Sequence, residues 1–480
     1  MSRLHVLLGT ALLIAATAAP VRAQDPESPA STWTGRSLDL AINGYGVSLG
    51  NSPGINGLRI NWRDRELHRV NGVNLTLWRP GENVGGTING VVLGVAAPAA
   101  GRITGVAAGL GAVVAERHLR GISVGGLAVV SQGGLDGIHV GGLGVVSGAA
   151  SRGIRVGGLA VVTGGPATGL SLGGLAVVSE GDQRGASVAG LATVSNGSMW
   201  GFNASGLATV AQGDMRGFNA AGLATVAEGS MTGANLSGLA TVSQGRMSGL
   251  NVSGLATVAQ GRMTGVNLAG LATVAQGGMA GINASGFATV SASSMTGVNL
   301  SGIATVTEGT ARWVNGAGGA LVANRSLQGL NVGGLAVVAN RALQGINLSV
   351  GALVGGREVT GLSTGGLAVV SGDGDVRGVA LSVGAVVADE ALRGFAVGGY
   401  KVEARDMKGL AASVARIKTS AMTGVSIGAY NEIRGRQTGL SIGLFNTADE
   451  LKGVQIGLLN RARNNPPPFR LLPLINVHFD

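Results

Sequence analysis

The sequence predicts an all-β repeat protein, and the architecture it favours is a β-solenoid built of 16-residue repeats. Gly occurs at every sixteenth residue from 126 to 302 without a slip, and Asn, Thr and Met recur at the same step. The chain holds 88 Gly in 480 residues, and each would cost a helix interior roughly 1 kcal/mol. In GVNLTLW (72–78), apolar and polar residues alternate, as they do along a half-buried strand. A fixed period with alternation of this kind indicates stacked coils of strands.

The first segment reads as a targeting sequence. Arg3 precedes the apolar run VLLGTALLIAATAA, which is too short to remain in a bilayer. The sequence Val21-Arg22-Ala23 then fits the small-residue pattern of a cleavage site. We therefore expect a signal peptide at 1–23, cleaved after Ala23, and a polar tether at 24–39. The chain is predicted to be exported.

The repeats divide the rest of the chain into four parts. Irregular N-terminal repeats or a cap are expected at 40–120, and the regular 16-residue body at 121–408. Shorter repeats follow at 409–463, and residues 464–480 form a C-terminal cap or terminal strand. Imperfect terminal units are typical of solenoids, whose ends must be capped.

Stacked coils place equivalent residues above one another, so the fixed residues are expected to form ladders. Asn amides would bond to one another along the axis, and Thr would stack through hydroxyls and β-branching. Leu and Val would fill a thin core, Met an irregular corner, and Gly the turns. The predicted ladders comprise Asn203, Asn219, Asn235, Asn251, Asn267, Asn283 and Asn299, and Thr193, Thr209, Thr225, Thr241, Thr257, Thr273, Thr289 and Thr305.

A transmembrane β-barrel of about 24–26 strands is the alternative architecture. Its neighbouring strands run antiparallel, whereas the turns QGRM, QGRM and QGGM are interchangeable at every single step, which favours the solenoid. Residues 203–312 also contain only Phe218 and Phe287 as aromatics, where a barrel carries aromatic girdles. The chain nevertheless ends in LLPLINVHFD, which resembles the terminal strand of outer-membrane barrels, so both architectures remain open.

Residues for catalysis, cofactors or metals do not stand out. The chain has no Cys, and none of its five His is paired at metal-ligand spacing. There is no GxxxxGK[ST] phosphate loop, and the turns lack the Asp of calcium-binding repeats. We therefore predict no catalytic, cofactor-binding or metal residues, no cofactor, and no enzyme activity.

Charge indicates the kind of partner. The formal net charge is +10, and we expect the Arg residues of the repeats to lie mostly in turns, along one edge of the solenoid. Such an edge would attract anionic envelope polymers or the outer membrane, although solubility and the blunting of lateral association are the simpler explanation of it. Nucleic acid is not expected, because the basic residues lack interleaved aromatics.

The C-terminal units resemble a known family. GVSIGAYN (424–431), GLSIGLFN (439–446) and GVQIGLLN (453–460) follow the unit G-φ-x-φ-G-φ-φ-N, where φ is apolar, of the bacterial envelope surface-repeat family. The resemblance covers residues 424–479, and the central units depart from it by one inserted residue and by Thr-Val in place of Leu-Asn. It implies an exported, outer-membrane or surface-associated repeat protein, and it brings no catalytic residues.

Together these observations predict a non-enzymatic protein of the cell envelope of a diderm bacterium. We expect it at the outer membrane or cell surface, with the periplasm or secretion as alternatives. Its role would be structural, or adhesive through binding. A pore or scaffold in the outer membrane is the alternative that goes with the barrel.

Overall fold

A computed structural model describes residues 37–78 and 85–479, and within them the chain forms strands and no helix. The predicted signal peptide (1–23) and most of the predicted tether (24–39) lie outside these residues. Residues 37–39 belong to the first strand, so the tether prediction was too long at its C-terminal end.

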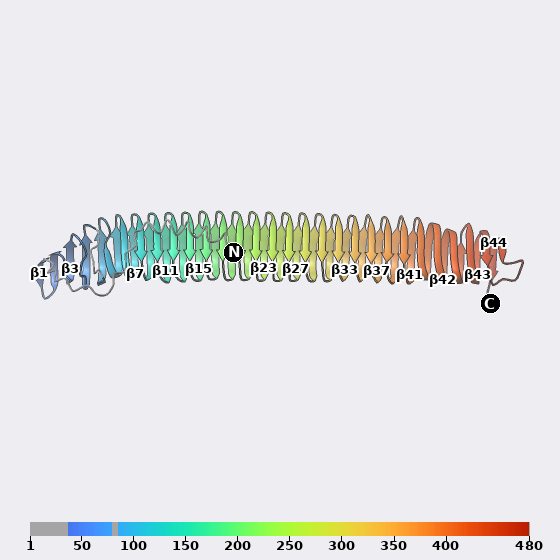
Figure 1. Cartoon of the computed structure of the whole chain (residues 1–480), viewed down its shortest axis with the longest axis horizontal. Helices are drawn as coiled ribbons and strands as arrows, with labels where there is room; N and C mark the ends of the chain where they lie inside the picture. Colours follow the sequence, from blue (N-terminus) through green and yellow to red (C-terminus); the bar gives the residue numbers. More distant parts are fainter. Residues whose placement is uncertain (1–36, 79–84, 480) are drawn as a thin grey trace, which may run out of the picture.

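The molecule is a β-solenoid of about 25 turns with repeats of about 16 residues, as predicted. Figure 1 shows its strands side by side along one long axis, with β1 at one end and β44 at the other. With coils spaced about 4.8 Å apart, the rod is about 120 Å long.

Each regular coil contains a long strand of seven or eight residues and a short strand of four. The long strands are β9 Gly134–Gly141, β11 Ser151–Gly157, β13 Ala167–Gly173, β15 Gln183–Ala189, β17 Met199–Ser205, β19 Met215–Ala221, β21 Met231–Ser237, β23 Met247–Ser253, β25 Met263–Ala269, β27 Met279–Ser285, β29 Met295–Ser301, β31 Ala311–Ala317, β33 Ser326–Gly333, β35 Ala342–Ser349, β37 Glu358–Gly365, β39 Asp375–Ser382 and β41 Ala391–Gly398. The short strands are β8 Ala128–Ser131, β10 Gly144–Ser147, β12 Ala160–Thr163, β14 Ala176–Ser179, β16 Ala192–Ser195, β18 Ala208–Ala211, β20 Ala224–Ala227, β22 Ala240–Ser243, β24 Ala256–Ala259, β26 Ala272–Ala275, β28 Ala288–Ser291, β30 Ala304–Thr307, β32 Ala320–Ala323, β34 Ala336–Ala339, β36 Ala352–Gly355, β38 Ala368–Ser371 and β40 Ala385–Ala388.

The strands outside this regular set begin and end the rod. They are β1 Ser37–Ile42, β2 Tyr45–Gly50, β3 Gly54–Asn61, β4 Arg69–Thr76, β5 Thr87–Gly94, β6 Ala99–Gly109, β7 Ala112–Gly125, β42 Lys401–Ile442, β43 Phe445–Ala462 and β44 Leu471–His478. At both ends the parallel stack finishes with an antiparallel strand, β1 on β2 and β44 on β43.

Every regular coil pairs with the next in parallel and in register. In the long-strand wall, Met247 of β23 lies opposite Met263 of β25, and in the short-strand wall Ala256 of β24 lies opposite Ala272 of β26. A barrel of one strand per repeat requires antiparallel neighbours. The barrel alternative is therefore wrong.

The core of the central coils is not the one predicted. In β25, Met263, Asn267 and Ala269 are buried, whereas Val266 and Leu268 lie on the outer face. In β26, the buried residues are Thr and Ala, and the Val between them faces outward. The expectation that Leu and Val fill the core is wrong here. Successive side chains of a strand point to opposite faces, so Asn267 and its neighbours Val266 and Leu268 lie on different faces of β25, and the face that carries Asn267 is the buried one. Met is also a core residue of the long strand and not a corner residue.

Glycine makes the close stacking possible at two positions of each coil. Gly265 has φ of +100°, a left-handed conformation that side chains rarely adopt. Gly254 lies at the corner between the long and short strands, where a Cβ atom would lie 1.9 Å from the carbonyl oxygen of Gly238. A side chain at Gly254 would have to move the neighbouring coil, whereas the position equivalent to Gly265 holds Trp313 in one coil, with φ of +88°.

Candidate functional site

The interior contains a continuous column of side-chain amides. From Asn203 to Asn347, each Asn donates from Nδ2 to Oδ1 of the Asn in the next coil, over 2.8–3.0 Å. All of these side chains are buried, and Asn347 passes the last bond to Ser363 Oγ at 3.2 Å. The structure thus brings the predicted Asn residues together, inside the rod.

The predicted Thr residues also stack in register and are fully buried. Their hydroxyls do not bond to one another. Thr209 Oγ1 donates to the carbonyl oxygen of Ala220 at 3.0 Å, and Thr305 Oγ1 to that of Gly316 at 2.9 Å, in each case on the long strand of the next coil. The Thr column therefore ties the short-strand wall to the long-strand wall.

On the N-terminal side, the Asn column continues as Ser123, His139, Arg155, Ser171 and Ser187. Ser123 Oγ lies 2.7 Å from His139 Nδ1, and Arg155 donates to Ser171 Oγ from Nη2 at 2.9 Å. Arg155 also donates from Nη1 and Nη2 to the carbonyl oxygen of Thr168, at 3.2 Å. Within the described residues Arg155 forms no ion pair with a carboxylate, so its charge is held by neutral oxygens.

Burial changes the titration of both basic groups in this segment. It lowers the pKa of His139 to about 4, and the charge of Arg155 acts in the same direction. It also lowers the pKa of Arg155 to about 10. His139 is therefore neutral and Arg155 charged at neutral pH.

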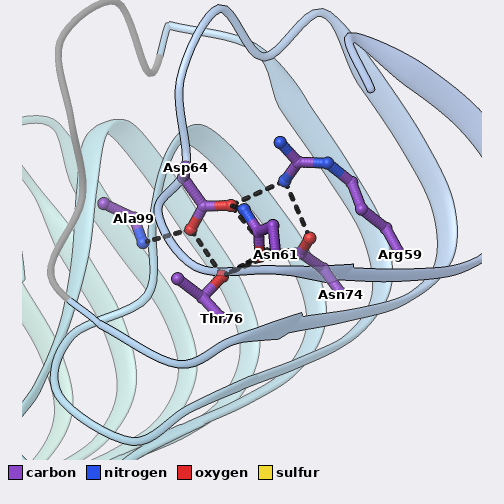
Figure 2. A network of polar contacts seen from close by, with 6 residues as sticks. All are labelled: Arg59, Asn61, Asp64, Asn74, Thr76 and Ala99. Atoms are coloured by element: carbon purple, nitrogen blue, oxygen red, sulfur yellow. Dashed lines mark hydrogen bonds and ion pairs between the residues drawn. The ribbon is translucent and has the colours of Figure 1, made fainter. Parts of the chain in front are cut away.

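A second buried polar network lies near the N-terminal end (Figure 2). The carboxylate of Asp64, between β3 and β4, accepts hydrogen bonds from Arg59 Nη1 at 2.6 Å, Asn61 Nδ2 at 2.7 Å, Asn74 Nδ2 at 3.2 Å, Thr76 Oγ1 at 2.7 Å and the amide of Ala99 at 3.5 Å. Arg59 and Asp64 are both fully buried. Removing one partner of such an ion pair typically costs about 3–5 kcal/mol, so this network holds the first coils together.

The outer surface is apolar at the corner that joins each long strand to its short strand. One large apolar side chain per coil projects there, in twelve successive coils, and each is between 37% and 56% exposed. We call this column the apolar ridge; it comprises Leu127, Leu143, Leu159, Leu175, Leu191, Leu207, Leu223, Leu239, Leu255, Leu271, Phe287 and Ile303.

A shallow groove runs beside the ridge on the long-strand side. Over the central coils it has a volume of about 540 Å³ and is lined by Val252, Leu268, Ala284 and Leu300, with the corner glycines as its floor. A groove of about 700 Å³ lies at the corresponding corner of the C-terminal coils, where Ile427, Ile442 and Ile456 line it. The apolar character of this corner therefore recurs along the rod.

Polar residues occupy the opposite corner. Arg246 and Arg262 lie there, in the turns that lead from a short strand to the next long strand. Other Arg residues lie on the outer faces of long strands, such as Arg184 and Arg216, which form ion pairs of 3.2 and 3.0 Å with Asp residues two positions earlier. The expectation that Arg lies mostly in turns was therefore only partly right, because Arg155 is even part of the interior.

Charged residues of the C-terminal coils form ladders of ion pairs. Glu403 accepts from Lys401 Nζ at 2.8 Å and from Lys418 Nζ at 2.7 Å. These two hydrogen bonds lower the pKa of Glu403 to about 2. Glu432 similarly accepts from Arg416 and Arg434.

Comparison with known proteins gives no relative: no family model, no curated protein and no solved structure matches the chain. The resemblance of residues 424–479 to the surface-repeat family therefore stays a prediction. The structure gives its motif a physical meaning, since Asn431 Nδ2 donates to Asn446 Oδ1 at 2.6 Å, and Asn446 Nδ2 to Asn460 Oδ1 at 2.7 Å.

The described part of the chain lacks two further kinds of feature. It contains no group of three or more His, Asp or Glu residues placed to hold a metal ion. It also contains no helix of the length and hydropathy needed to cross a membrane.

Two features of the site escaped the sequence analysis. His139 and Arg155 stand four and three repeats before Asn203, so counting back along the Asn column would have found them. The Leu column was equally visible as a repeat, because each Leu follows a corner Gly. Its outward direction was not visible, since alternation alone does not say which face is buried.

Proposed function

We propose that the chain is a non-enzymatic, exported structural protein of a bacterial cell envelope, a rod that presents one uniform outer surface to a partner. The observation that carries this proposal is the apolar ridge, which repeats in twelve successive coils. A soluble monomer rarely exposes a contiguous apolar patch above a few hundred Å², and larger patches mark interaction surfaces.

The uniformity of the rod supports a structural or adhesive role. Each central coil repeats the same backbone at the same spacing and carries a large apolar side chain at the ridge position, so a partner meets a periodic surface and not a single pocket. The net charge of +10 adds attraction to anionic envelope components, such as polymers or the outer membrane. Membership of the surface-repeat family is part of the proposal and rests on residues 424–479.

Cell fractionation combined with electron microscopy tests the proposal. We expect the protein in the envelope fraction of a diderm host, and purified particles as unbranched rods of about 120 Å. Retention in the cytoplasmic fraction of a host with an intact secretion system would contradict the envelope role, whatever the shape of the particles.

A further inference from the structure

We propose that a pocket near the C-terminal end of the rod binds an acidic saccharide, with sugar rings against an apolar strip and carboxylate or phosphate groups against arginine side chains. The pocket has a volume of about 920 Å³ and lies over β42, β43 and β44, at the end of the rod opposite β1 (Figure 1). Small-molecule sites have volumes of this size. The inference rests on the proposed envelope function and names the class of polymer that the rod binds.

One side of the pocket is a strip of aromatic and apolar side chains. Tyr430 of β42 lies opposite Phe445 of β43 in the sheet, and Leu459 and Leu471 continue the strip toward β44. Phe445 is 48% exposed, Leu459 38% and Leu471 51%, so the strip is open to a ligand. Arg416 stacks on the Tyr430 ring, with its Cζ atom 5.6 Å from the ring centroid. The free part of the strip therefore begins at Phe445.

The other side of the pocket is basic. Arg461 lies on β43, Arg463 directly follows that strand, and Arg470 precedes β44; all three are exposed and line the pocket. Arg463 Nη1 pairs with Asp449 at 3.0 Å, and Arg470 donates from Nε to the carbonyl oxygen of Asn465 at 3.1 Å. Within the described residues, Arg461 and Arg470 form no ion pair with a carboxylate. Two guanidinium groups of the pocket are thus available to an anion.

The remaining carboxylates of these coils are engaged by other arginines. Glu432 accepts hydrogen bonds from Arg416 and Arg434, and Glu450 accepts one from Arg436 Nε at 3.1 Å. None of these five side chains lines the pocket. The pocket therefore keeps a positive charge that an anionic ligand balances, and guanidinium groups bind carboxylate and phosphate through paired hydrogen bonds.

The mixture of side chains favours a sugar over an acyl chain. Five of the nine residues that line the pocket are polar or charged, including Thr447, whose hydroxyl lies on the same face of β43 as Phe445. An acyl chain would leave these polar groups without partners. A sugar ring carries an apolar face of C–H groups and an edge of hydroxyl groups, so it matches a pocket that has an apolar strip on one side and hydrogen-bond donors on the other.

The backbone beneath the pocket argues against an extended peptide. Strand β43 supplies most of the lining, and it is paired with β42 on one side and with β44 on the other. It therefore offers no free edge to which a peptide strand could add. Recognition depends on the side chains of the outer face alone.

Calorimetric titration of the full chain with matched acidic and neutral sugars tests this proposal. The probes are tetragalacturonate against maltotetraose, and glucose 6-phosphate against glucose, at low ionic strength, where attraction between charges is least screened. Tetraglutamate is the acidic peptide for comparison. We expect each acidic sugar to bind at least about tenfold more tightly than its neutral counterpart, because charge-assisted hydrogen bonds are made only by the acidic one. Tetraglutamate should bind about tenfold more weakly than tetragalacturonate.

Two variants locate the binding in the pocket. Arg461→Gln and Phe445→Ala each change one side of it, and both side chains are exposed, so the coils should stay folded, which urea unfolding checks. The matched control is Arg434→Gln, which removes an exposed arginine of the same coils that does not line the pocket. Each pocket variant should weaken the binding of tetragalacturonate about tenfold, and the control less than about twofold.

Four results would overturn the proposal. Neither acidic sugar could bind, or the neutral sugars could bind as tightly as the acidic ones. Tetraglutamate could match tetragalacturonate, which would make the pocket a site for acidic peptides. The variants at Arg461 and Arg434 could weaken binding equally, which would assign it to the overall charge of the rod. Each of these leaves the envelope rod intact, because fractionation and particle shape are measured without sugars.

Discussion

At the scale of the residue, the interior amide column shows how one polar side chain holds two neighbours. Asn251 accepts from Asn235 and donates to Asn267, both at 2.8 Å. Each Asn in the column is fully satisfied along the axis only while both neighbours are present. A buried polar group that loses its partner retains the cost of its desolvation, so the column specifies the register of the coils as well as stabilising them.

Asn251→Ala should therefore lower the free energy of unfolding by about 2–4 kcal/mol, because it leaves one buried donor and one buried acceptor unpaired. The control is Asn340→Ala, which removes an exposed bond of 3.3 Å to Asn324 on the outside of the rod. Urea unfolding measures both. Equal, small shifts for the two variants would show that the interior ladder contributes nothing specific.

His139 predicts a dependence of stability on pH. Its pKa in the folded chain is about 4, against 6.5 for an unperturbed His, so between these values the unfolded chain binds a proton that the folded chain does not. The free energy of unfolding should then fall as pH falls from 6.5 to 4, by up to about 3 kcal/mol, and should be insensitive to this group above pH 6.5.

The variant His139→Ser isolates this effect, since Ser occupies the same column at 123 and 171. Urea unfolding is measured at pH 7.0, above the window from 4 to 6.5, and at pH 5.0, inside it. The free energy of unfolding should fall less between these two values for the variant than for the native chain. An identical loss in both would mean that burial of His139 does not perturb its pKa.

At the scale of the element, the coil is the unit of the fold. Each contains one long strand, one short strand and two corners, and it pairs with its neighbours through equivalent residues sixteen positions apart. Energetics of this kind are close to a sum of coil and interface contributions. Whole coils can therefore be removed, whereas fractions of a coil cannot.

Deletion of residues 254–269 should leave a folded rod with one coil fewer, because Ser253 is then followed by the equivalent corner residue Gly270. Deletion of 254–261 should instead destabilise the chain severely, because it joins a long strand to a turn and interrupts the Asn, Thr and Met columns together. Circular dichroism and urea unfolding compare the two. Similar behaviour of both deletions would contradict the register described here.

The sequence predicted the coil far better than its orientation. The Gly grid, the recurring Asn and the interchangeable turns are local signals, and they favoured a parallel stack with equivalent residues above one another over the antiparallel barrel. Alternation in GVNLAG is satisfied whether Val266 and Leu268 face in or out, so the choice depends on the whole assembly. The buried face is the one that carries Asn267, because Asn side chains of successive coils hydrogen-bond to one another there. Such a column of hydrogen bonds depends on many coils and cannot be read from one.

At the scale of the whole molecule, the rod combines a polar interior with an apolar ridge on its outside. Closely paired backbone carries the structure from β1 to β44 without a disulfide, since the chain has no Cys (Figure 1). The antiparallel strands β1 and β44 terminate the stack, and the network around Asp64 fastens its first coils. Length is thus set by the number of repeats and thickness by the sequence of one repeat.

Solution X-ray scattering of the full chain and of a variant lacking residues 199–278 tests the stacking of coils most directly. The deletion removes five whole repeats and joins Ser198 to Met279 in phase. We predict that the maximum dimension falls by about 24 Å while the cross-sectional radius stays the same, since each coil adds about 4.8 Å along the axis. An unchanged maximum dimension, or a smaller cross-sectional radius at the same maximum dimension, would contradict the solenoid.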